Sequence, residues 1–213
     1  NDLIAHLTDA SRPLPKLYPT AGDRAAVNRL IAIAPSGSPP IAPAGSLAED
    51  PAAPGTPQGP KAETLREQLR SDDQKIKYCT IAPASVWFTK QWPAEKWIEL
   101  IKLLPQDQRV LLIGGPGDSG LCERIAKEAG RGEVLAGKLS LLGTAALMEG
   151  ATMNYVNDSA PLHIASSMNA SVTAVFCSTV PAFGFGPLNA NGRIVERAEP
   201  LYCRPCDLHG YKA

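Results

Sequence analysis

Polar side chains that could bind an anion follow an apolar run in the segment VNDSAPLHIASSMN, residues 156–169. Asp158 and Ser159 directly precede a predicted helix that has Pro161 in its first turn, where proline is well tolerated. Either side chain could cap that helix, and composition alone favours this plain capping role. The alternative is an anion site, because the free N–H groups and the dipole of a helix start attract phosphate.

Three neighbours of this helix start bear on the choice between a cap and an anion site. Ala160 is small enough to let a phosphate approach the backbone. His163, in the first turn, could donate a hydrogen bond to that phosphate, although a helical histidine is usually a packed or surface residue. Asp158 would repel a phosphate, so its better task is to accept hydrogen bonds from hydroxyl groups, as on a sugar.

Two other loops after apolar runs carry residues of the same kind. Asp118 in GGPGDSG could accept from ribose hydroxyls or cap the next helix, but neither G-x-G-x-x-G nor a P-loop is present. Lys90 lies between Trp87 and Trp92 and could neutralise a diphosphate as a point charge. The alternative for Lys90 is a solvated lysine lying over a tryptophan face.

The cysteines suggest two different roles. Cys203, Cys206 and His209 have C-x2-C-x2-H spacing, which could supply three zinc ligands, but a fourth is not evident and free thiols are the alternative. The other three cysteines lie singly in apolar or helical segments and are predicted to be buried free thiols in a reducing compartment: Cys79, Cys122 and Cys177.

Strands and helices alternate from residue 77 onward, which predicts an α/β fold with a parallel sheet covered by helices. Ligands bind at the carboxyl ends of the strands in such sheets, so the loops described above are expected at one edge. The predicted strands cover residues 78–83, 109–115, 133–137, 151–158 and 171–178. The predicted helices cover residues 93–104, 118–130, 140–150 and 160–168, with Ser140 as an N-cap and Gly130 closing its helix.

The N-terminal part of the chain has a different character. Residues 1–34 form a lead-in with a predicted helix at 21–34. Eight prolines fall between residues 35 and 60, so residues 35–62 are predicted to be a flexible linker or insertion. A short exposed helix is expected over residues 62–74.

Bulk composition excludes some classes of protein. The 213 residues contain 21 Lys plus Arg and 21 Asp plus Glu, a balance that argues against a nucleic-acid binder driven by phosphate neutralisation. No apolar run reaches transmembrane length, and the N-terminus is not a signal peptide. The first residue is not Met, so a fragment or a processed product is expected.

Six segments in order carry a family resemblance: IAPASVWFTKQWPAEKW, LLIGGPGD, LAGKLSL, NDSAPLHIASSMN, FCSTVPAFGFGPL and CRPCDLHG. Together they resemble the C-terminal half of a bacterial ADP-heptose:lipopolysaccharide heptosyltransferase of glycosyltransferase family 9. The resemblance runs from about Leu14 to the end and leaves out the Pro-rich segment. It implies a Rossmann-like domain, residues 63–213, that is the nucleotide-sugar-binding half of a GT-B enzyme.

The resemblance also implies a role for each matching position. Lys90 would stabilise the diphosphate leaving group, and Ser85 and Val86 would lie near the phosphates. Asp118 would lie near the ribose, and Asp158 would accept from heptose hydroxyls. The remaining positions would line the adenine pocket (Leu139, Ser140, Leu141) or surround the phosphates (Ser159, Ala160, Pro161, His163). Many relatives have Gly where this chain has Ala160.

The implied reaction is transfer of heptose from ADP-heptose to the lipopolysaccharide inner core, with inversion and without a metal or other cofactor. The family's general base belongs to an N-terminal acceptor-binding domain that this sequence lacks, so at most slow hydrolysis of the donor is expected. The resemblance implies a cytoplasmic location, peripheral at the inner face of the inner membrane. The alternatives are another nucleotide-sugar enzyme of GT-B architecture, such as a UDP-sugar transferase or epimerase, and a non-catalytic nucleotide-binding module.

Overall fold

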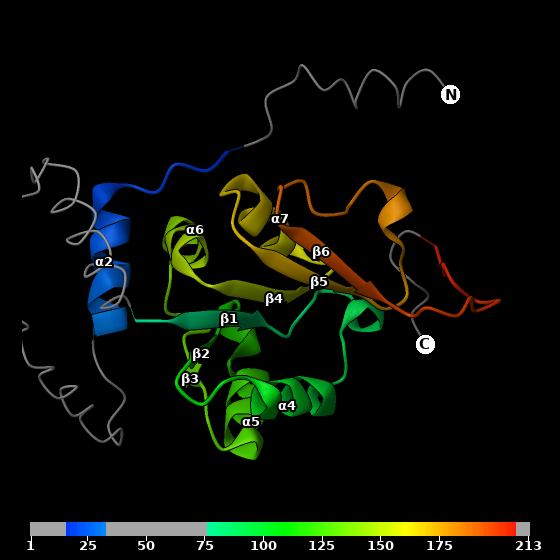
Figure 1. Ribbon diagram of the computed structural model, residues 1–213, viewed down its shortest axis with the longest axis horizontal. Coiled ribbons are helices and arrows are strands. Elements are labelled where there is room, and N and C mark those ends of the chain that lie inside the picture. Colours follow the sequence, from blue (N-terminus) through cyan, green and yellow to red (C-terminus); the bar gives the residue numbers. More distant parts are fainter. Residues whose placement is uncertain (1–15, 33–75, 208–213) are drawn as a thin grey trace, which may run out of the picture.

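The computed structural model describes residues 16–32 and 76–207, and its centre is one six-stranded sheet (Figure 1). The strand order is β3-β2-β1-β4-β5-β6, and every pair of neighbours is parallel. This confirms the predicted parallel sheet. The strands are β1 (Tyr78–Ala82), β2 (Arg109–Leu112), β3 (Glu133–Val134), β4 (Met153–Asn157), β5 (Val172–Phe176) and β6 (Gly192–Glu196).

Helices cover both faces of the sheet, as the alternating pattern predicts. In Figure 1, α4 (Ala94–Leu103) and α5 (Ser119–Ala129) lie below the sheet, and α6 (Leu141–Gly150) and α7 (Ala160–Ser167) lie above it. Successive side chains of a strand point to opposite faces. In β1, Cys79 and Ile81 therefore join the core with α4 and α5, whereas Tyr78 and Ala82 join the core with α6 and α7.

The helix boundaries follow local signals in the sequence. Pro93 precedes α4, where its missing N–H costs nothing. Ser140 caps α6 by accepting a hydrogen bond from the backbone N–H of Gly143 at 3.0 Å. Gly130 ends α5 in the left-handed conformation, with φ 73°. Ser140 and Gly130 were predicted in these roles, whereas Pro93 was predicted as the first residue of its helix and is the N-cap instead.

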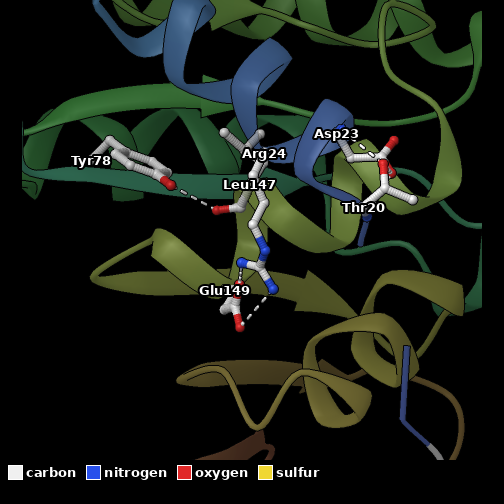
Figure 2. Close-up of polar contacts among 6 residues, drawn as sticks. All are labelled: Thr20, Asp23, Arg24, Tyr78, Leu147 and Glu149. Carbon is white, nitrogen blue, oxygen red and sulfur yellow. Dashed lines mark hydrogen bonds and ion pairs between the residues drawn. The ribbon is translucent and has the colours of Figure 1, made fainter. Parts of the chain in front are cut away.

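One further helix, α2 (Ala21–Ala32), packs against α6 at the side of the sheet (Figure 1). Thr20 and Asp23 exchange hydrogen bonds at its start, as Figure 2 shows. The Arg24 guanidinium pairs with the Glu149 carboxylate near the end of α6 (Figure 2). Val27 is the buried residue of α2, and the partly buried Ile31 packs against the same core, so a few apolar side chains and the polar contacts attach the helix.

Strand β6 was not predicted. It lies at the edge of the sheet, and four of its five residues are exposed. An edge strand of this kind lacks the continuous apolar run that marks a buried parallel strand, so periodicity alone does not detect it.

Some predictions concern residues outside the described part of the chain. They are the Pro-rich linker at 35–62, the helix at 62–74, and the first 15 residues and the end of the 1–34 lead-in. Within residues 16–32 and 76–207, no helix combines the length and the apolar character needed to span a membrane.

Candidate nucleotide-sugar site

Lys90 and Asp158 form an ion pair at the carboxyl edge of the sheet. Lys90 ends the 3-10 helix η1 (Phe88–Lys90) after β1, and Asp158 directly follows the neighbouring strand β4. The Lys90 Nζ lies 2.7 Å from Asp158 Oδ2, and the two residues are only 7% and 3% exposed. The prediction that these residues share one region is confirmed, and the lysine is buried rather than solvated.

The ring of Phe185 lies over Lys90. Lys90 Nζ lies 5.9 Å from the centre of the Phe185 ring, within reach of a cation–π contact. The same ring packs edge-on against the exposed His163 of α7, with ring centres 6.4 Å apart. Trp92 instead packs edge-on against the buried Trp97. Phe185 thus brings Lys90 and His163 together, although sequence reasoning gave it no role.

Asp158 has a second partner that sequence reasoning also missed. The Thr179 hydroxyl donates to Asp158 Oδ2 at 2.7 Å, and Thr179 is 1% exposed. Its position just beyond the end of β5 is the available signal, because polar residues after strand ends were the criterion that identified Asp158.

Asn157 fixes the loop that carries Lys90. Its Nδ2 donates to the Pro83 carbonyl at 2.8 Å, and its Oδ1 accepts from the Trp92 N–H at 3.0 Å. Asn157 is fully buried, so both ends of its amide replace hydrogen bonds to water. One side chain at the end of β4 therefore holds the start and the end of the β1–α4 loop.

The start of α7 has no side-chain cap. Ser159 is the N-cap residue, but its side chain makes no capping hydrogen bond, and its hydroxyl lies 3.4 Å from the Asn157 carbonyl. The Asp158 carboxylate is held by Lys90 and Thr179. The plain capping role for either side chain is therefore wrong. Pro161 lies in the first turn as predicted, and Ala160 is exposed.

Asp118 folds back onto its own loop. Its Oδ2 accepts from the Gly115 N–H at 2.8 Å, and a Cβ added at Gly114 would lie 2.7 Å from that oxygen. Asp118 also precedes α5 as its N-cap residue, without a side-chain capping bond. The carboxylate thus shapes the turn after β2.

The residues predicted to line the adenine pocket lie in the loop between β3 and α6. Ser140 caps α6 and also donates to Asp23 Oδ1 of α2 at 3.3 Å, and Leu141 is 60% exposed. A cavity of about 350 Å³ opens here between α2 and the start of α6. It is lined by Asp23, Ala26, Val27, Arg29, Leu30, Lys138, Leu139, Ser140 and Gly143.

The predicted residues therefore fall into two groups along one sheet edge. The ends of β1 and β4 carry the Lys90–Asp158 group, and the ends of β2 and β3 carry Asp118 and residues 139–141. Ser85 lies in the first group and accepts from Gln91 Nε2 through its backbone carbonyl at 2.7 Å. Val86, beside it, is 97% exposed.

The predicted zinc trio is only partly described. Cys203 is exposed and Cys206 half-buried, and His209 lies outside the described residues. The Cys206 thiol lies against the Cys203 carbonyl. No cluster of three or more His, Cys, Asp or Glu side chains suited to a metal occurs within the described ranges. Cys79 and Cys122 are buried free thiols, as predicted, and Cys177 is half-buried.

Comparisons with known proteins agree on one family. The profile described as Glycosyltransferase family 9 (heptosyltransferase) matches residues 28–210. Lipopolysaccharide heptosyltransferase 1 of Pseudomonas aeruginosa is 28% identical over 144 residues, which cover 66% of this chain and 39% of that protein. The resemblance carried by the six segments is thereby confirmed.

Two solved structures from E. coli share the fold. ADP-heptose LPS heptosyltransferase II superposes with a TM-score of 0.62 at 17% identity, over 90% of this chain and 48% of that one. Heptosyltransferase WaaC with ADP superposes with a TM-score of 0.53 at 28% identity, over 58% of this chain and 39% of that one. The chain thus spans less than half the length of these relatives, and the match confirms the predicted α/β fold.

Proposed function

Because the chain belongs to glycosyltransferase family 9, we propose that it is the donor-binding part of an enzyme that transfers heptose from ADP-heptose to the lipopolysaccharide inner core. The observation that carries this proposal is the buried Lys90–Asp158 pair beside the uncapped start of α7. A cation and a helix start at one strand edge suit a diphosphate. WaaC, a 28% identical relative, was solved with ADP.

Lys90 is the group that stabilises the leaving diphosphate in this proposal. Its ammonium offers three donors, and burial strengthens its attraction for an anion. Ser85, Val86, Ser159, Ala160 and Pro161 contribute the surrounding backbone, and His163 donates from the first turn of α7. Charge that develops on the leaving group is thus met by donors that are already in place.

The remaining residues recognise the sugar and the nucleoside. Asp158 accepts hydrogen bonds from heptose hydroxyls, because a carboxylate offers more acceptor sites than its two present partners use. Asp118 lies near the ribose. Leu139, Ser140 and Leu141 receive the adenine, and the adjoining cavity under α2 gives that base an apolar wall at Ala26 and Val27.

Transfer also needs an acceptor and a base that removes the proton of its hydroxyl group. We assign both to an acceptor-binding part outside the 213 residues, since the match covers only 39% of the longer relative. The 213 residues alone should therefore hydrolyse the donor slowly at most. The proposed reaction inverts the anomeric centre and uses no metal. The proposed location is cytoplasmic, peripheral at the inner face of the inner membrane.

Calorimetric titration of the chain with ADP and UDP tests the nucleotide assignment. We expect ADP to bind more tightly, and tighter binding of UDP would instead indicate a UDP-sugar enzyme of the same architecture. Failure to bind either nucleotide would overturn the proposal altogether.

A second titration compares ADP-heptose with ADP in the Asp158→Ala variant. The loss should be about tenfold for ADP-heptose and smaller for ADP, since a hydrogen bond to a charged group contributes about 1.5–3 kcal/mol. Removing the carboxylate also frees Lys90 for the diphosphate, which supports ADP binding. Equal losses for both ligands would give Asp158 a purely structural role.

A further inference from the structure

Thr179 lies against the proposed donor site, but neither sequence reasoning nor the family match gives it a role. Its hydroxyl donates to Asp158 Oδ2, the oxygen that also receives Lys90 Nζ, and both distances are 2.7 Å. Asp158 thus holds two donors on one oxygen. No hydrogen bond from the described residues reaches Asp158 Oδ1.

The two donors differ in how easily they can leave. Lys90 is a cation, so an incoming diphosphate competes with Asp158 for its charge. Thr179 is neutral and 1% exposed, so a diphosphate does not attract its hydroxyl group by charge. When Lys90 turns to a diphosphate, Thr179 becomes the remaining donor to a carboxylate that is almost fully buried.

The backbone around Thr179 is held from a distant part of the chain. Arg204 Nη2 donates to the Thr179 carbonyl at 2.7 Å and also contacts Glu196 Oε2 at 2.7 Å and the Phe176 carbonyl at 3.2 Å. This ties the loop after β5 to the ends of β5 and β6. The Thr179 hydroxyl is therefore presented from a fixed backbone.

We propose that Thr179 is a positioning residue, which holds the Asp158 carboxylate in its orientation while Lys90 is engaged by the diphosphate, so that Asp158 can accept hydrogen bonds from the sugar. This inference rests on the proposed function. Thr179 acts through Asp158, so it should affect recognition of the sugar more than recognition of the nucleotide.

The test compares ADP and ADP-heptose binding in Thr179→Val, Thr179→Ser and the unaltered 213-residue chain. Valine keeps the shape and removes the hydroxyl group, whereas serine keeps the hydroxyl group. We expect Thr179→Val to weaken ADP-heptose about tenfold and ADP less than twofold, as for a lost hydrogen bond to a charged group. Thr179→Ser should restore affinity to within about threefold, since the donor remains.

Thr80→Val is the matched control. Thr80 is also fully buried, and its hydroxyl bonds a polar side chain, Asn154 Oδ1 at 2.5 Å, but it lies within β1. We expect Thr80→Val to lower thermal stability about as much as Thr179→Val does. It should leave the preference for ADP-heptose over ADP unchanged.

The outcomes separate the two proposals. If the unaltered chain binds neither ligand, the proposed function fails. If the unaltered chain prefers ADP-heptose and Thr179→Val keeps that preference, only the role of Thr179 is overturned. The same holds if Thr179→Ser loses the preference as fully as Thr179→Val does. If Thr179→Val does not fold, the serine variant decides, because retained preference supports the proposal and lost preference contradicts it.

Discussion

At the scale of single residues, burying Lys90 and Asp158 carries a large unfavourable free energy of desolvation. Moving a lysine and a carboxylate out of water costs several kcal/mol for each ion, and their attraction repays this cost only when the contacts are good. Here the carboxylate has a 2.7 Å ion pair and a 2.7 Å hydroxyl donor. A buried site that only needed stability would do as well with two apolar residues, which favours a functional reason for this pair.

Substitution of the pair separates its structural role from its binding role. Lys90→Met should lower the free energy of unfolding by about 3 kcal/mol, because it leaves Asp158 buried without a counter-charge. The double variant Lys90→Met/Asp158→Leu should recover most of that loss yet bind ADP at least about tenfold more weakly than the unaltered chain, since one charge-assisted contact is gone. Urea unfolding and calorimetry measure the two quantities. A double variant that binds ADP normally would remove Lys90 from the diphosphate site.

Sequence reasoning found the residues that follow strand ends in recognisable segments. It placed Lys90 and Asp158 in one region because parallel strands end at one edge. It missed Asn157 and Thr179, although both are polar residues at or just beyond strand ends. Their roles depend on which backbone or side-chain group lies opposite, 74 residues away for Asn157 and Pro83, and no local pattern encodes that distance.

At the scale of elements, the loops after β2 and β3 are locked together. The Gly137 N–H donates to the Gly114 carbonyl at 2.9 Å, and a Cβ at position 137 would lie 2.8 Å from Pro116 Cα. Gly137 also has φ 74°, a conformation that disfavours side chains. These two loops carry Asp118 and the predicted adenine residues, so their spacing decides how the nucleoside would fit.

Two glycine variants isolate the importance of that close approach. Gly130 has nearly the same φ, 73°, but an added Cβ there would meet nothing within 4 Å. Gly130→Ala should therefore cost only the penalty of the left-handed conformation, about 1–2 kcal/mol. Gly137→Ala should cost a further 1–3 kcal/mol, roughly, because Pro116 backbone must move. Equal losses in urea unfolding would show that the two loops are not in firm contact.

The positions of the helices and strands along the chain were more predictable than the way these elements pack on one another. Each predicted helix and strand between residues 78 and 178 has a counterpart in the structure, because caps, prolines and apolar runs are local signals. The packing of α2 on α6 was not predicted. It depends on an ion pair and hydrogen bonds between residues more than 100 positions apart, such as Arg24 with Glu149 (Figure 2).

At the scale of the whole molecule, the sheet buries ionisable groups on both faces. Burial raises the pKa of the Cys79 thiol to about 11 and that of the Cys122 thiol to about 12. Both thiols belong to the core with α4 and α5. On the other face, burial raises the pKa of Tyr78 to about 12, and its hydroxyl donates to the Leu147 carbonyl at 2.8 Å (Figure 2).

These shifts predict that the fold loses stability in alkali. From about pH 9 upward the unfolded chain releases protons from the two thiols, whereas the folded chain keeps them until about pH 11 or 12. The unfolded state then binds fewer protons, so the free energy of unfolding falls as pH rises, by about 1.4 kcal/mol per pH unit for each fully titrating group. Below pH 9 this contribution is fully present. Urea unfolding at pH 8 and pH 10.5 with a thiol reductant measures the fall.

Variants of the same core assign that fall to the thiols. Cys122→Ala should make the dependence on pH shallower, because one titrating group has been removed. Ile125→Ala, another fully buried change in this cluster, should lower stability by about 2–5 kcal/mol at both pH values and leave the slope unchanged. An unaltered slope in Cys122→Ala would show that the alkaline loss arises elsewhere. Tyr78→Phe, which removes a buried phenol on the opposite face, would then be the next variant to compare.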